Sequence, residues 1–143
     1  MPCREHVAQL RDQEGEFSAR GARIVTISFG PAAKALAWLK ETRSAFPLLV
    51  DARRETYRAY GMRRSLHGSW SIATVRRYRQ LMRDGHEWRG IQGDSLQLGG
   101  DVIIDAAGIV RLLHPSKSPT DRASPQDLLA VLSELRGQVE PGT

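Results

Sequence analysis

One side chain in the sequence can act as a soft nucleophile, and it stands almost at the start of the chain. Cys3 is the only cysteine among the 143 residues, and an amphipathic run over residues 4–20 follows it. A thiol in the first turn of a helix lies beside unpaired N–H groups and the positive end of the helix dipole, which favour the reactive thiolate. Thiol redox chemistry is therefore the first candidate activity, and an inert buried cysteine is the alternative.

The other potentially reactive side chains form no comparable pattern. Four histidines and three aspartates are the candidates: His6, His67, His86, His114, Asp51, Asp101 and Asp105. No two histidines have the spacing of a zinc site, and Asp105 fits the first position of a tight turn. The sequence also lacks the glycine-rich loops of nucleotide-binding proteins and the serine motif of α/β-hydrolases. It therefore indicates no metal and no cofactor.

The length and composition predict one ordinary globular domain that must position this thiol. Apolar residues make up 41% of the chain and charged residues 26%, which are typical globular values. No apolar run approaches the roughly 20 residues that cross a bilayer, and no secretory leader pattern opens the chain. With one cysteine, the chain as given cannot form an internal disulfide. We expect a single domain over residues 1–143, in a cytoplasmic protein that does not contact membranes.

Arginine supplies most of the formal net charge of +5, and it is concentrated in one part of the chain. The arginines concerned are Arg53, Arg54, Arg58, Arg63, Arg64, Arg76, Arg77, Arg79, Arg83 and Arg89. Such a stripe can bind phosphates or another anionic partner. A solvated basic face explains the pattern more simply, so nucleic acid is the less favoured partner.

The first half of the chain has the rhythm of a βαβ unit. A helix is predicted over residues 4–20, a buried strand over 22–28, a helix over 31–43 and a short strand over 46–51. Strand, helix and strand in this order favour a parallel sheet.

The second half is less regular until a clear β-hairpin. A brief helix over 53–60 and a helical, Arg-rich insertion over 62–93 precede it. The hairpin is predicted over 101–105 and 109–114, with residues 106–108 as the turn. A last helix begins with Ser124 as its N-cap and Pro125 in its first position, and Gly137 is predicted to end it.

The order of these elements, with three segments, resembles the peroxiredoxin-like branch of the alkyl hydroperoxide reductase/thiol-specific antioxidant (AhpC/TSA) family. The first segment is Pro-Cys-Arg-Glu-His at residues 2–6. The second is Phe-Pro-Leu-Leu-Val-Asp at 46–51, followed by Tyr57, Tyr60 and Gly61. The third runs from Gln97 through Val-Ile-Ile-Asp at 102–105 to Gly-Ile-Val at 108–110. The resemblance implies a thioredoxin-like mixed sheet flanked by helices.

The chain departs from its family at the decisive motif. The family that this chain resembles carries the motif Cys-x-x-Cys-Arg-Glu after a central strand. Cys3, Arg4 and Glu5 match the last three positions of this motif. The first motif cysteine would fall immediately before Met1. We therefore expect the central strand to be missing, so that two halves of the sheet present unpaired edges. The hypothesis is that Met1 is an internal methionine of a longer product.

The resemblance implies a thiol-dependent antioxidant or thiol–disulfide oxidoreductase that acts through Cys3. Loss of the first motif cysteine would be expected to impair this activity. Arg4 is the candidate for supporting the thiolate, and Gly99 and Gly100 are expected to let the backbone approach the cysteine helix. A peroxide or a protein or low-molecular-weight thiol would be the substrate, with an external thiol as reductant. An exposed sheet edge would favour a homo-oligomer. The alternative is a redox-silent thioredoxin-fold module that binds an anionic partner through its basic insertion.

Overall fold

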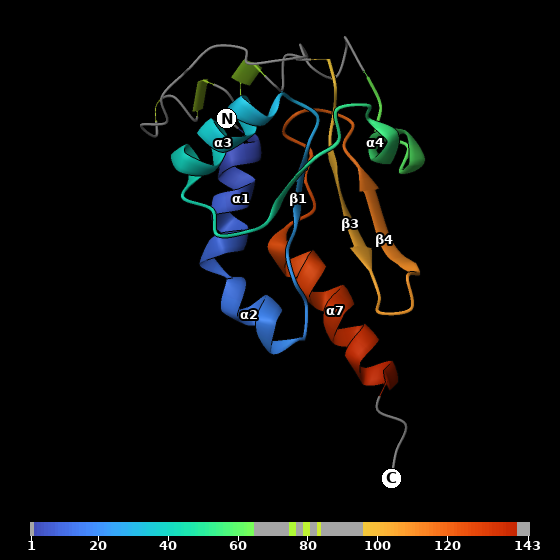
Figure 1. Cartoon of the computed structure of the whole chain (residues 1–143). Coiled ribbons are helices and arrows are strands. Elements are labelled where there is room, and N and C mark those ends of the chain that lie inside the picture. The colour runs from blue at the N-terminus through green and yellow to red at the C-terminus, as the bar shows by residue number, and fades with distance from the viewer. Residues whose placement is uncertain (1, 65–74, 77–78, 81–82, 84–95, 140–143) are drawn as a thin grey trace.

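The structure is a computed structural model that describes residues 2–64, 75–76, 79–80, 83 and 96–139. Its helices and strands appear in the following order (Figure 1): α1 Pro2–Asp12, α2 Glu14–Ala19, β1 Thr26–Ser28, α3 Ala32–Thr42, β2 Leu48–Val50, α4 Glu55–Ala59, β3 Gly100–Ile104, β4 Val110–Pro115 and α7 Pro125–Val139. Most of the predicted insertion over 62–93 lies outside the described residues. None of the described helices is long and apolar enough to cross a membrane.

The strands form two separate pairs in the described part of the chain. β1 and β2 are parallel, with Thr26 opposite Leu48 and Ser28 opposite Val50. β3 and β4 are antiparallel, and their register shifts at a bulge between Ile103 and Ile104. The fold is thus the predicted mixed α/β arrangement, with the predicted sheet present as two two-stranded sheets.

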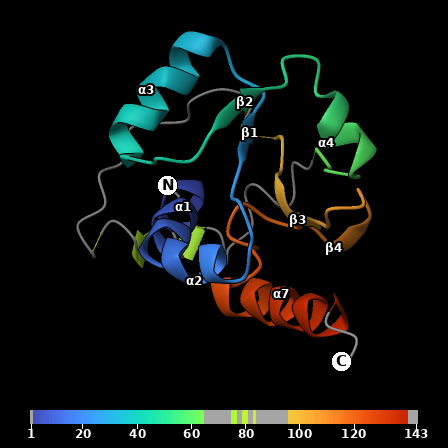
Figure 2. The ribbon, with the colours of Figure 1, turned by 60° about the horizontal axis from the view of Figure 1, so that its bottom comes forward.

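The hydrophobic core lies where α1, α2 and α7 meet the strands (Figures 1 and 2). Its buried members come from α1, α2, the segment before β2, the loop before α7 and α7 itself: Val7, Leu10, Phe17, Phe46, Ala123 and Leu128. Ile24, Ile103 and Leu112 pack against them from the strand side. This core fixes α1, and with it the position of Cys3, against the start of α7.

The N-terminal helix differs from the single helix predicted over 4–20. It begins earlier, at Pro2, and it is interrupted at Gln13, whose φ of −112° and ψ of 14° are not helical. The Gln13 N–H donates to the Leu10 carbonyl, so the helix tightens there before α2 begins. The interruption lets Phe17 on α2 and Leu10 on α1 both face the core.

Other element boundaries also differ from the predictions. The strand predicted over 22–28 is regular only at Thr26–Ser28, since only that part pairs with β2. Pro31 precedes α3 with an extended ψ of 147° instead of occupying its first turn. Ser124 and Pro125 begin α7 as predicted, and the Ser124 hydroxyl accepts the Asp127 N–H at 3.1 Å. The predicted helix end at Gly137 is wrong, because α7 continues to Val139.

Candidate active site at the start of the first helix

Cys3 is an exposed free thiol in the first turn of α1. Pro2 occupies the preceding helical position, where its missing N–H would have no intrahelical partner in any case. The side chain of Arg122 reaches the thiol, and its Nη2 donates a hydrogen bond to Cys3 Sγ at 3.0 Å. A hydrogen bond from a cation to sulfur stabilises negative charge there. The N-terminus of α1 and the Arg122 guanidinium therefore both place positive charge beside the Cys3 sulfur.

Arg122 belongs to the loop between β4 and α7, and hydrogen bonds hold this loop at both ends. The Ser116 N–H donates to the Gly99 carbonyl at 2.9 Å, and the Ala123 N–H donates to Asp101 Oδ2 at 3.2 Å. Next to Arg122, the Asp121 carboxylate accepts the Lys117 N–H at 2.7 Å. His114 Nε2 donates to the same carboxylate at 3.0 Å. The backbone position of Arg122 is thus fixed by both strands of the hairpin.

The guanidinium of Arg122 occupies space that a glycine leaves open. A Cβ atom at position 99 would lie 3.0 Å from both Nη1 and Nη2 of Arg122. Burial by itself would lower the pKa of Arg122, but the charges of Cys3 and Asp101 and the hydrogen bond to Cys3 raise it above its ordinary value. Arg122 therefore stays cationic beside the thiol.

A nearly buried hydrogen-bonded pair of side chains lies next to Arg122. His6 Nε2 and Asp101 Oδ1 are 2.9 Å apart, and their side chains are only 8% and 13% exposed. Burial alone would raise the pKa of Asp101, but the hydrogen bond and charge of His6, then the charge of Arg122 and the Ala123 N–H, lower it. Asp101 thus remains a carboxylate that joins α1, β3 and the Arg122 loop.

Tyr57 on α4 completes the surroundings of the thiol. Its hydroxyl donates to the Ile27 carbonyl at 2.9 Å. Burial raises the pKa of Tyr57 to about 12, and the negative charges of Cys3 and Asp51 raise it as well. The positive charges of Arg122 and Arg54 act in the opposite direction and lower it. Tyr57 is therefore a neutral phenol at ordinary pH, and its hydroxyl proton is used in the hydrogen bond to the Ile27 carbonyl of β1.

The other residues singled out from the sequence have different neighbours. The guanidinium of Arg4 forms an ion pair with Glu41 at 2.5 Å, on the side of α1 that faces α3. That Arg4 supports the Cys3 thiolate therefore stays a prediction, which no contact of Arg4 supports. Gly99 faces Arg122, as described above, while a Cβ atom on Gly100 would lie 2.4 Å from the His114 carbonyl oxygen and 2.5 Å from Met62 Sδ. The missing side chains of Gly99 and Gly100 thus leave room for Arg122, the His114 carbonyl and Met62, while an approach to the cysteine helix stays a prediction.

The aspartates considered for acid–base chemistry are engaged in structural contacts. Asp51 accepts the N–H groups of Glu55 and Thr56 at 3.0 and 2.8 Å and so caps α4. Asp105 accepts the N–H groups of Ala107 and Ile109, both at 2.9 Å, which confirms its turn role. Arg122 was missed, because nothing in its polar loop distinguishes it from the other arginines.

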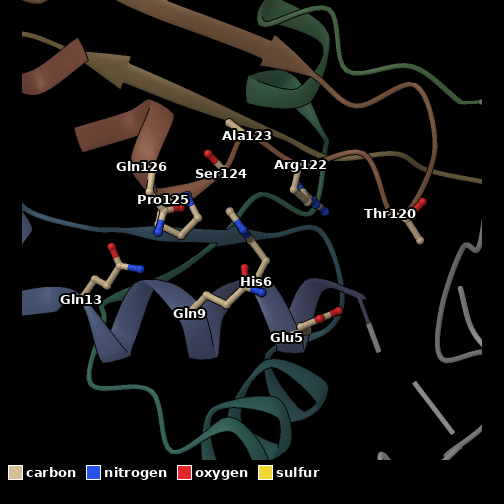
Figure 3. A pocket seen from close by; sticks show the side chains of 10 residues that line it. All are labelled: Glu5, His6, Gln9, Gln13, Thr120, Arg122, Ala123, Ser124, Pro125 and Gln126. Atoms are coloured by element: carbon tan, nitrogen blue, oxygen red, sulfur yellow. The ribbon is translucent and has the colours of Figure 1, made fainter. Parts of the chain in front are cut away.

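A hollow of about 400 Å³ adjoins the site, between α1 and the start of α7 (Figure 3). Its α1 side is formed by Glu5, His6, Gln9 and Gln13, and the opposite side by Thr120 and residues 122–126. The side chains of Gln13 and Gln126 approach the same space from the two helices (Figure 3). Arg122 belongs to both the hollow and the thiol contact.

One comparison with known proteins agrees with the thioredoxin-like interpretation. A search of curated proteins found no match to this sequence. The family model described as AhpC/TSA antioxidant enzyme matches residues 9–118. Neither Cys3 nor Arg122 lies within the matched range, so their contact is an independent observation. Because the match covers well over half of the chain, the protein belongs to the AhpC/TSA antioxidant enzyme family.

Proposed function

We propose that the protein is a thiol-dependent antioxidant oxidoreductase in which Cys3 is the redox-active residue. Membership of the AhpC/TSA family supports a peroxiredoxin-like antioxidant or thiol oxidoreductase, with a peroxide or a thiol as substrate. The observation that carries the assignment to Cys3 is its 3.0 Å contact with Arg122. We assign the support of the thiolate to Arg122 in place of Arg4.

The reaction with a peroxide follows from a thiolate beside a fixed cation. Cys3 Sγ attacks the terminal oxygen of a hydroperoxide, so that an S–O bond forms and the O–O bond breaks. Sulfur is oxidised to a sulfenic acid, and the peroxide is reduced to an alkoxide that takes a proton from solvent to become an alcohol. Arg122 remains positively charged throughout and can stabilise charge at the sulfur or on the departing oxygen.

An external thiol then returns the enzyme to its starting state. Its thiolate attacks the sulfenic sulfur, forming a mixed disulfide and, with one proton, releasing water. A second molecule of the same thiol attacks the mixed disulfide. This step releases the Cys3 thiolate and a disulfide of the external thiol, so two thiols are consumed for each peroxide.

The test compares peroxide consumption by the wild-type chain and the Cys3→Ser variant, with a low-molecular-weight thiol in excess. We expect the variant to consume peroxide no faster than the thiol alone. Equal consumption by both proteins would contradict the proposal. A salt-dependent interaction with an anionic partner, unchanged in Cys3→Ser, would then favour the alternative of a binding module.

A further inference from the structure

We propose that the hollow between α1 and α7 binds the external thiol, and that this thiol is a small peptide-like molecule with amide and carboxylate groups. The proposal rests on the proposed function, because it identifies the reductant of Cys3 by its chemical class. Three features of the hollow carry it: its polar groups, its size and its link to the thiol through Arg122.

The polar groups of the hollow are suited to a peptide. Within the part of the chain that the structure describes, the side-chain amides of Gln9, Gln13 and Gln126 have no hydrogen-bond partner. Each offers both a carbonyl acceptor and N–H donors, which is what peptide groups of a ligand require. Gln13 and Gln126 face each other across the hollow, so one ligand can contact both (Figure 3).

Arg122 provides the anchor for a negative group. Its Nη2 donates to Cys3, while its Nη1 has no hydrogen-bond partner among the described residues. A guanidinium carries five N–H donors, so Nη1 can bind a ligand carboxylate while Nη2 keeps its contact with sulfur. The carboxylate would thereby be held close to the thiol.

The composition of the hollow argues against other ligand classes. Among the described residues that line it, Ala123 and Pro125 are the only apolar ones, too few to hold a lipid chain. Arg122 is the only arginine or lysine among the described lining residues, and Glu5 adds a carboxyl group to the same lining, which disfavours a polyphosphate. A small polar molecule of mixed donors and acceptors remains.

The dimensions also fit a short peptide. A volume of about 400 Å³ lies within the usual range for small-molecule sites. Gln9 lies roughly 9 Å along the axis of α1 from Cys3 at about 1.5 Å per residue. An extended tripeptide spans roughly 10 Å. A thiol-bearing tripeptide that spans the hollow can therefore reach the Arg122 end, where the guanidinium contacts Cys3 Sγ.

Binding is tested separately from redox chemistry by using a ligand that cannot react. S-methylglutathione is titrated calorimetrically into the wild-type chain, into Cys3→Ser and into the double variant Gln9→Leu/Gln13→Leu. We expect equal binding by the first two proteins and about tenfold weaker binding by the double variant. Ser18→Leu, an exposed neutral substitution on α2 outside the hollow, is the matched control and should bind as the wild type does.

Reduction is then measured on the oxidised enzyme with two thiols. The double variant should lose about tenfold in its rate with glutathione and keep the wild-type rate with 2-mercaptoethanol, which lacks peptide groups. Absence of S-methylglutathione binding, or binding that the glutamine substitutions leave unchanged, would overturn the proposal. Failure of peroxide to oxidise Cys3 would instead contradict the proposed function, while the binding result would still decide this site.

Discussion

The two flanks of α1 both carry arginine contacts, but they differ in burial and in consequence. On the flank that faces α3, Arg4 pairs with Glu41 and Arg11 donates to the Thr42 carbonyl. The Arg4 and Glu41 side chains are each 27% exposed, so water screens their attraction. On the flank that faces the Arg122 loop, the His6–Asp101 pair is almost buried and Arg122 contacts the thiol.

This difference explains why one flank braces the helix, while the other places a guanidinium against the thiol. Charges in a partly buried network interact more strongly than charges in water, provided that every charge has a partner. Arg122 and Asp101 carry such charges, and hydrogen bonds connect them to Cys3 and His6. Proximity in sequence favoured Arg4, whereas the fold brings Arg122 to the thiol from the other end of the chain.

The largest expected effect comes from removing the cation on the buried flank. Arg122→Met should slow alkylation of Cys3 by iodoacetamide at pH 7 by about 10- to 100-fold, since a hydrogen bond to a charged group is worth about 1.5–3 kcal/mol. Arg4→Met removes an arginine at the exposed flank and is the matched control, with an expected change below about twofold. Equal effects of the two substitutions would remove the distinction between the flanks.

Loss of the buried carboxylate should chiefly reduce stability. Asp101→Asn weakens the contacts to His6 and to the Ala123 N–H, and we expect it to lower the free energy of unfolding by about 2 kcal/mol at pH 7 in urea titrations. Glu41→Gln, on the exposed flank, should lower it by less than about 1 kcal/mol. A larger loss from Glu41→Gln would reverse the ranking of the two flanks.

The difference in unfolding free energy between the wild type and Asp101→Asn should depend on pH in a definite direction. Because the pKa of Asp101 is lowered in the folded state, its contribution to stability is full above the ordinary aspartate pKa of about 3.9 and is lost as the pH falls through the folded-state value. The wild-type advantage over Asp101→Asn should therefore be constant near neutrality and shrink below about pH 4. An advantage that grows on acidification would contradict the lowered pKa.

Alanine substitutions at Gly99 and Gly100 should distinguish effects on stability from effects on the reactivity of the Cys3 thiol. Gly100→Ala places a Cβ atom 2.4 Å from the His114 carbonyl oxygen, a backbone group that cannot easily move. We expect a loss of about 1–2 kcal/mol in unfolding free energy and a near-normal alkylation rate of Cys3. An alkylation rate reduced in proportion to stability would show that the reactivity merely follows the integrity of the fold.

Gly99→Ala should have the opposite and smaller effect. Its Cβ atom would lie 3.0 Å from the flexible end of Arg122, which can shift by a few tenths of an ångström. Stability should change by less than about 0.5 kcal/mol, while Cys3 alkylation slows a few-fold because the hydrogen bond to sulfur lengthens. Unchanged alkylation in this variant would show that the position of Arg122 tolerates displacement.

Features that depend on neighbouring residues were predictable from the sequence. The β3–β4 hairpin follows from Asp105, whose carboxylate accepts two turn N–H groups, and from Gly108, whose φ of 82° suits glycine. The start of α7 follows from Ser124 and Pro125 in the same way. The thiol at the start of a helix was also recognisable, since helix position and residue type are both local.

Features set by distant contacts were not predictable. Arg122 reaches Cys3 because the loop is anchored to Gly99 and Asp101, and no local pattern encodes these anchors. The apolar segment over residues 22–28 is longer than β1, because a strand extends only as far as its partner pairs with it. The glutamines of the hollow belong to two helices that only the folded chain brings together.

The most direct test of the account is the rate at which peroxide converts Cys3 to a sulfenic acid. Dimedone traps the sulfenic acid, and intact-protein mass spectrometry follows the adduct in the wild type, Arg122→Met and Arg4→Met. We predict that the wild type forms the adduct about tenfold or more faster than Arg122→Met and at the rate of Arg4→Met. Formation of the adduct at the rate of free cysteine, equal in all three proteins, would contradict a redox site built by Arg122.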